Sequence, residues 1–172
     1  MRLILNLLDI SKAEEGALSV SRTRFDLGAL TASLLDAIRV RATAKEISLT
    51  SAIEPLEVEA DQDLLRRVFE NLLDNALRYA PKGSAVRLDA RLHAEELEIR
   101  IADQGKGIPK EMRESIFERF VQLDHKERTA PRTGRGLGLT FCRLAVEAHG
   151  GRIYVEDGEP GTVFCIRLPH VG

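Results

Sequence analysis

The chain has 172 residues, 44% of them hydrophobic and 30% charged, a composition typical of a soluble globular domain and not of a disordered or fibrous chain. Its 25 basic and 27 acidic residues nearly balance, which gives no support to nucleic-acid binding, and its two cysteines are too few for a disulfide framework. No apolar run approaches the roughly 20 residues that span a membrane and no signal peptide is visible, so we expect a cytoplasmic location, with membrane anchoring of a parent protein left open.

The first segment, residues 1–16, has a helical pattern that places Leu3, Leu7 and Ile10 on one stripe, with Gly16 as a C-cap. A helix of about four turns cannot bury so wide an apolar face alone. We therefore expect it to pack on a helix absent from this sequence, on a second copy, or on the following domain. Residues 17–24 are predicted to be a linker, and residues 25–172 the main domain.

Periodicity and turn residues predict the remaining elements, with Asp26 and Asp61 as N-caps of the first two helices. A loop from 103 to 137, containing a short helical piece around Glu111–Phe120, is long enough to indicate a functional segment. The predicted helices are 27–44, 62–79 and 139–149, and the predicted strands are 47–53, 56–60, 86–92, 97–102, 152–156 and 162–168.

The second predicted helix has an unusual polar face. Asn71, Asn75 and Arg78 stand at i, i+4 and i+7 and so share one side. Asparagine is unfavourable inside a helix because its amide competes with the backbone. An Asn carbonyl can ligate Mg²⁺ and an Arg can pair with phosphate, although a solvated polar face would explain this helix equally well if it stood alone.

Two glycine-rich motifs follow. Asp103 stands at the end of a predicted strand, where a buried carboxylate can accept a hydrogen bond from an exocyclic amine such as that of adenine, and Gly105 and Gly107 allow close approach of the backbone. A surface turn is the alternative. The second motif, residues 134–139, leads directly into a helix, whose unpaired N–H groups favour an anion; a flexible hinge is the alternative there.

Together, these motifs call for a purine nucleotide with several phosphates and Mg²⁺, and their order resembles the nucleotide-binding domain of sensor histidine kinases in the GHKL ATPase superfamily. The resemblance covers about residues 25–169. Four boxes carry it: the asparagine box 71–79, the first glycine box 103–108, the phenylalanine box 116–120 and the second glycine box 134–139. It implies an α+β fold, a two-layer sandwich in which three long helices cover one face of a mixed, mainly antiparallel sheet.

The resemblance also implies a role for each matched residue. Asn75 would ligate Mg²⁺, Asn71 would support the metal or the phosphates, and Arg78 would pair with phosphate, which makes these three the catalytic residues. Asp103 would read the adenine amine. The lid, about residues 109–133, would be mobile. The other residues implied to bind ATP are Tyr79, Gly105, Gly107, Ile108, Phe117, Phe120, Arg132, Gly134, Arg135, Gly136, Leu137, Gly138, Leu139 and Thr162.

One position bears on the reaction. ATP-hydrolysing members of the superfamily typically carry a Glu one turn before the metal-binding Asn, whereas this chain has Asn71 there, and Glu70 points about 100° away. Slow hydrolysis and transfer to a histidine are therefore implied. The four histidines lack the acceptor context of the family, so the acceptor would lie on the dimerisation domain of the same protein, of which residues 1–16 would be the end.

Partners implied by the resemblance are ATP and ADP, a phosphoacceptor domain that is dimeric in the parent protein, and a response-regulator receiver domain. Three alternatives stay open. An anti-sigma-factor-type serine kinase shares the fold, a nucleotide-sensing module would bind without transfer, and a gyrase- or chaperone-like ATPase would turn over ATP without an acceptor.

Overall fold

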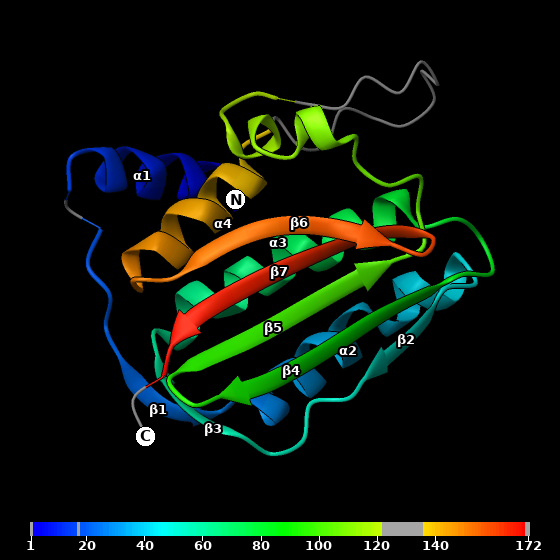
Figure 1. The fold of residues 1–172 in the computed structure, drawn as a ribbon, viewed down its shortest axis with the longest axis horizontal. Coiled ribbons are helices and arrows are strands. Elements are labelled where there is room, and N and C mark those ends of the chain that lie inside the picture. Colours follow the sequence, from blue (N-terminus) through cyan, green and yellow to red (C-terminus); the bar gives the residue numbers. More distant parts are fainter. Residues whose placement is uncertain (1, 17, 122–135, 171–172) are drawn as a thin grey trace.

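The computed structural model describes residues 2–16, 18–121 and 136–170. These ranges contain four α-helices and seven strands, whose arrangement can be followed in Figure 1. The helices are α1 (Arg2–Glu14), α2 (Leu27–Ala44), α3 (Gln62–Tyr79) and α4 (Gly138–Ala148). The strands are β1 (Thr23–Asp26), β2 (Ser48–Ser51), β3 (Glu57–Ala60), β4 (Ala85–His93), β5 (Glu96–Asp103), β6 (Arg152–Gly158) and β7 (Gly161–Pro169).

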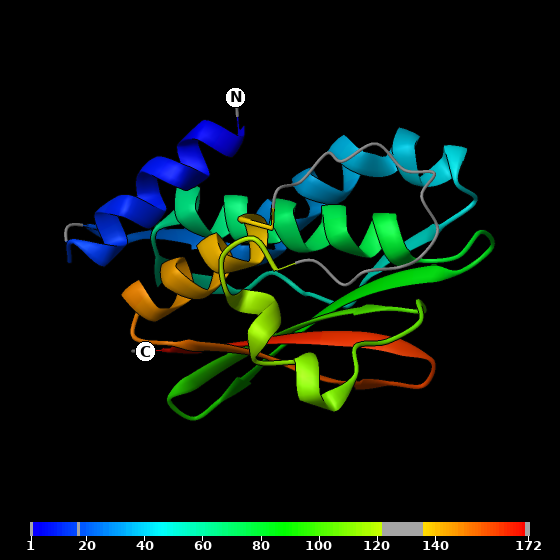
Figure 2. The same cartoon turned by 90° about the horizontal axis from the view of Figure 1, so that it is seen from above.

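The main sheet has five strands in the order β2-β4-β5-β7-β6, and only the β2–β4 pair is parallel. Helices α2, α3 and α4 lie together on one face of this sheet, as Figure 2 shows from above. This arrangement confirms the predicted two-layer α+β sandwich. The two predicted strands on either side of Pro55 do not share a sheet, however, because β3 pairs with β1 in a separate two-stranded sheet.

Both predicted helix caps are present. The Asp26 side chain accepts a hydrogen bond from the Ala29 N–H, and the Asp61 side chain accepts from the N–H groups of Asp63 and Leu64. These bonds satisfy backbone donors that a helix start leaves unpaired. The helical piece predicted around residues 111–120 is wrong in form, since the chain makes two separate 3₁₀ turns, Lys110–Met112 and Ser115–Phe117.

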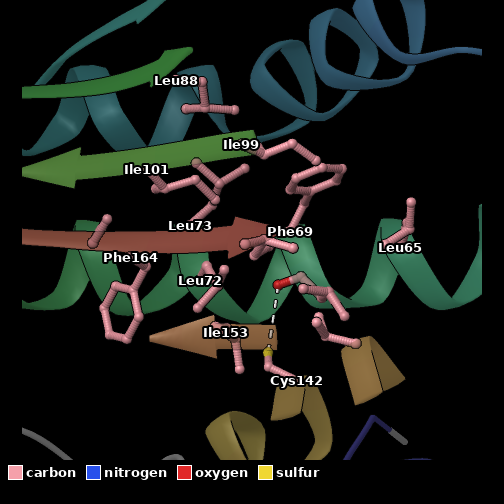
Figure 3. Close-up of a cluster of buried hydrophobic side chains, with 14 of the residues drawn as sticks. Leu65, Phe69, Leu72, Leu73, Leu88, Ile99, Ile101, Cys142, Ile153 and Phe164 are labelled. Atoms are coloured by element: carbon pink, nitrogen blue, oxygen red, sulfur yellow. Dashed lines mark hydrogen bonds between the residues drawn. The ribbon is translucent and has the colours of Figure 1, made fainter. Parts of the chain in front are cut away.

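The core lies between α3 and the sheet. Figure 3 shows Phe69 and Leu73 of α3 beside Ile99 and Ile101 of β5, and all four side chains, like Leu72 of α3, are almost fully buried. The 3.6-residue period of α3 and the two-residue period of β5 each place apolar side chains on one face, and these two faces pack together. Because the apolar side of α3 faces the sheet, Asn71 and Asn75 lie on the other side of the helix.

The opposite face of the sheet is ionic. Glu98 is almost fully buried and accepts from Arg167 Nε at 2.9 Å, and Arg100 pairs with Glu156 at 2.9 Å. Cys165 lies among these groups with no exposed surface, and burial raises the pKa of its thiol to about 12. Cross-strand charge pairs of this kind let a sheet face water without a second layer of helices.

Helix α1 packs on α4 through an edge that the apolar stripe does not predict. Ile10 and Asn6 are buried, whereas Leu7 and Leu8 are about half exposed. The buried side-chain oxygen of Asn6 is satisfied by a hydrogen bond that it accepts from Arg67 of α3. No helix among residues 2–16, 18–121 and 136–170 has both the length and the hydropathy to cross a membrane.

Candidate functional site

The asparagine face of α3 meets the start of α4. The Asn71 Nδ2 group donates to the Arg67 carbonyl oxygen at 2.8 Å, four residues back along α3. Its Oδ1 atom faces Gly138, where a Cβ atom would lie 2.8 Å from that oxygen. The asparagine box and the described end of the second glycine box are therefore in direct contact, and a side chain at Gly138 would require the Asn71 amide to move.

The rest of this face opens toward solvent. Asn75 is half-buried, one turn beyond Asn71, and Arg78 and Tyr79 are exposed at the end of the helix. Amide oxygens and a guanidinium on one accessible face suit a polyanion and its counter-ion.

Asp103 ends β5 in a buried position, with 6% of its surface exposed. Its Oδ1 atom accepts from the Gly105 N–H at 2.7 Å, and its register partner on β7 is the buried Thr162. Burial raises the pKa of the Asp103 carboxyl, and the N–H groups of Gly105 and Thr162 oppose that rise. A buried carboxylate at the end of a strand is suited to accept a hydrogen bond from a ligand amine.

Close backbone contacts hold the loop after β5 in place. A Cβ atom at Gly105 would lie 2.9 Å from the Tyr79 carbonyl oxygen, and one at Gly161 would lie only 1.9 Å from the Asp103 carbonyl oxygen. Gly107 has a φ of +76°. The end of α3, the end of β5 and the start of β7 therefore meet at one end of the sheet (Figure 1).

The phenylalanine box divides into a buried and an exposed residue. Phe117 is buried and makes an edge-to-face contact with Phe164, with ring centroids 6.4 Å apart. Phe120 has 64% of its surface exposed and a φ of 62°, and its N–H donates to the Gly136 carbonyl oxygen at 3.0 Å. Phe117 thus fastens one end of the long loop to the core, while Phe120 joins its two described ends.

The remaining predicted positions differ in burial. Leu137 is buried, while Ile108 and Leu139 are partly buried against the core. The predicted residues Arg132, Gly134 and Arg135 lie outside the described residues.

Two further side chains make long-range contacts in this region, and the four boxes include neither of them. Arg113 donates through Nε to the Ile108 carbonyl oxygen at 3.2 Å and pairs through Nη2 with Asp157 of β6, which ties the first glycine box to the β6–β7 hairpin. No local pattern could have found this contact, because it depends on how the hairpin packs.

His149 is the second. Its Nε2 atom accepts from the Asp61 N–H at 3.0 Å and its Nδ1 atom lies 2.7 Å from the Ala145 carbonyl oxygen, so the ring is neutral with its proton on Nδ1. Burial lowers the pKa of His149. The ring therefore joins the start of α3 to the end of α4 and is not placed to accept phosphate.

The described residues offer amide oxygens, not a cluster of carboxylates or imidazoles, to a metal ion. Within the described ranges, no group of three or more His, Cys, Asp or Glu side chains could hold one. Mg²⁺ commonly takes one or two protein oxygens and completes its shell with phosphate and water. The Asn75 amide fits that pattern, whereas a metal cage made of protein alone does not.

Comparison with known proteins gives a family and a fold. The family model described as histidine kinase-, DNA gyrase B- and HSP90-like ATPase matches residues 60–172. Among curated proteins, the adaptive-response sensory kinase SasA of Rippkaea orientalis is 36% identical over 173 residues, covering 98% of this chain and 43% of its own length. The chain spans less than half the length of the curated relatives that it matches.

Solved structures of histidine kinases resemble this chain in fold. The mycobacterial sensor histidine kinase MprB is 32% identical with a TM-score of 0.73, covering 87% of this chain and 98% of that one. Full-length ShkA, solved in complex with AMPPNP, is 28% identical with a TM-score of 0.84, covering 98% of this chain and 35% of that one.

Proposed function

This chain belongs to the family of histidine kinase-, DNA gyrase B- and HSP90-like ATPases, and on that basis we propose that it is the ATP-binding catalytic domain of a two-component sensor histidine kinase. It transfers the γ-phosphoryl group of ATP to a histidine on the dimerisation domain of the same protein. That phosphate then passes to an aspartate of a response-regulator receiver domain. The domain acts in the cytoplasm.

The contact between Asn71 and Gly138 supports this proposal most directly. It brings the asparagine box to the N-terminus of α4, where free N–H groups and the helix dipole favour phosphate. Such a site needs both a metal-binding face and an anion-binding backbone, and the contact supports a site that combines the two. Gly136 and Gly138 then serve in the hinge of the lid, while the other residues expected there, Arg132, Gly134 and Arg135, lie outside the described residues.

Each half of the nucleotide has its own residues. Asp103 accepts a hydrogen bond from the adenine amine, with Ile108 and Tyr79 beside the base and Thr162 at the floor of the pocket. Asn75 ligates Mg²⁺ with the phosphates, Asn71 supports it, and Arg78 pairs with a phosphate oxygen. Mg²⁺ bound with ATP neutralises charge that develops in phosphoryl transfer. The chain itself positions the γ-phosphate.

The histidines of the chain favour an acceptor located elsewhere. His149 is buried and both of its ring nitrogens are engaged by backbone groups. His93 is exposed at the β4–β5 turn, and His170 follows β7. His93 and His170 therefore lie near the end of β5 opposite to Asp103, and the fourth, His125, lies outside the described residues. Since Asn71 replaces the water-activating Glu of the ATPases, transfer to a partner histidine is favoured over hydrolysis.

Calorimetric titration with ATP and Mg²⁺ tests the site. Binding is expected for the unaltered chain and loss of binding for Asn75→Ala and Asp103→Ala. Gln62→Ala, which removes an amide from the other end of α3, serves as the matched control and should bind normally. Unaltered affinity in either site variant would remove the corresponding assignment.

A supplied phosphoacceptor domain and γ-labelled ATP test the reaction. Acid-labile, alkali-stable label should appear on the acceptor and not on this chain alone. Label on serine would instead indicate the anti-sigma-factor-type kinase, turnover without an acceptor a gyrase-like ATPase, and binding without any transfer a nucleotide sensor.

A further inference from the structure

Arg67 joins three helices through its side chain. The Nη1 group donates to Asp9 Oδ2 at 2.5 Å and the Nη2 group to Asn6 Oδ1 at 2.9 Å, both on α1. The guanidinium carbon lies 4.1 Å from the ring centroid of Phe141 on α4. One α3 side chain therefore holds α1 by two hydrogen bonds and α4 by a cation–π contact.

This junction is largely shielded from water. The side chains of Arg67 and Asp9 are 20% and 16% exposed, and Asn6 and Phe141 are buried. The Nε atom of Arg67 is buried without a hydrogen-bond partner in the described part of the chain. The guanidinium consequently depends on the two α1 side chains, and removal of one would leave a buried charge poorly compensated.

The same residue adjoins the asparagine face. Its carbonyl oxygen accepts from Asn71, whose Oδ1 faces Gly138, and Phe141 stands one turn after Gly138 on α4. Movement of the guanidinium away from Phe141 would therefore loosen the start of α4 where it meets Asn71. Space for that movement exists, because Arg67 also lines a cavity of about 300 Å³ shared with Asp9 and Asp61.

We propose that Arg67 is a positioning residue that couples the seating of α1 to nucleotide binding at Asn71 and Gly138. Nucleotide binds more tightly when Asp9 and Asn6 hold the guanidinium over Phe141. Release of α1 frees the guanidinium, shifts the start of α4 and weakens binding. The coupling is mutual, so bound nucleotide also favours the seated position of α1. This inference rests on the proposed function, since it concerns the same nucleotide site.

The test compares two charge-removing variants on the same helix by calorimetry with ATP and Mg²⁺ on the full chain. Asp9→Asn removes the buried partner of Arg67. Glu14→Gln removes an equal charge from the half-exposed ion pair with Arg119, which is expected to contribute little. Affinity should fall about fivefold or more for Asp9→Asn and stay within about twofold for Glu14→Gln. The double variant Asp9→Asn, Arg67→Met should lose no more ATP affinity than Arg67→Met alone, because both substitutions break the same interaction.

A second readout separates coupling from loss of stability. Hydrogen exchange should slow in α1 when nucleotide binds the unaltered chain, and this protection should be absent in Asp9→Asn. If Arg67→Met does not fold, Asn6→Ser gives the second variant. Unchanged affinity in Asp9→Asn, an equal loss in Glu14→Gln, or no protection of α1 would overturn the coupling while leaving the nucleotide site intact. Absence of binding by the unaltered chain would instead refute the proposed function, and the coupling with it.

Discussion

Replacement of Asp103 by asparagine tests the adenine contact with almost no change of shape. Asp103 Oδ1 already accepts from the Gly105 N–H at 2.7 Å, so an asparagine keeps its carbonyl oxygen there and turns its NH₂ group toward the base. The ligand amine then meets a donor where it had an acceptor. A hydrogen bond to a charged group contributes about 1.5–3 kcal/mol, and its loss should weaken ATP binding about tenfold to 150-fold.

The same substitution should not destabilise the fold. Because burial raises the pKa of Asp103, the ionised carboxylate is less favourable in the folded chain than in the unfolded one at neutral pH. A neutral asparagine removes that cost, so the melting temperature should be equal or higher. Loss of affinity together with retained stability is typical of a residue that serves ligand binding.

Isothermal calorimetry and thermal melting, both at pH 7, measure the two effects. Asp36→Asn provides the control, since it removes the same charge from an exposed position on α2 and should leave both quantities unchanged. Wild-type affinity in Asp103→Asn would refute the adenine assignment, and a fall in melting temperature would refute the reasoning about its buried charge.

Three further predictions concern stability, measured by urea unfolding. Because His149 has a lowered pKa in the folded chain, stability should fall as the pH drops below 6.5, by at most about 1.4 kcal/mol per pH unit from this residue, and His149→Gln should flatten that dependence. Gly161→Ala should lower the free energy of unfolding by more than about 2 kcal/mol. Gly83→Ala, also at positive φ but in open space, should lower it by only about 1–2 kcal/mol. Equal losses would contradict the close contact of Gly161 with the Asp103 carbonyl oxygen. Phe117→Ala should lower the free energy of unfolding by about 3–5 kcal/mol, and Phe120→Ala, which truncates an exposed side chain, by less than about 1 kcal/mol. The reverse order would contradict the anchoring role of Phe117.

Features with local causes could be predicted from the sequence. The caps at Asp26 and Asp61, the length of α3 and the β4–β5 hairpin each follow from residues within a few positions of one another. Asn71 and Asn75 could be singled out because an asparagine is locally unfavourable inside a helix. The contact of Asn71 with Gly138 could be expected only through the family resemblance, because nothing local relates the two.

Features that depend on long-range packing could not be predicted. Alternating hydrophobicity marks β3 as a strand without identifying β1 as its partner, and the apolar stripe of α1, which includes the buried Ile10, gives no sign that Asn6 is buried as well. The bonds of Arg67 to α1 and of Arg113 to Asp157 join residues distant in the sequence. In the sequence pattern alone, Arg67 and Arg113 are indistinguishable from arginines on a solvated surface.

The ionic face of the sheet has a practical consequence for its thiol. Because burial raises the pKa of Cys165 to about 12, its thiol is protonated at pH 7, and Cys142 is likewise buried, between α4 and α3. Neither can react with an alkylating reagent until its cover opens. The chain therefore carries two internal reporters of its own opening, one beneath the arginines of the sheet and one beneath the helices. A difference between their labelling rates would separate loosening of the sheet face from unfolding of the whole domain.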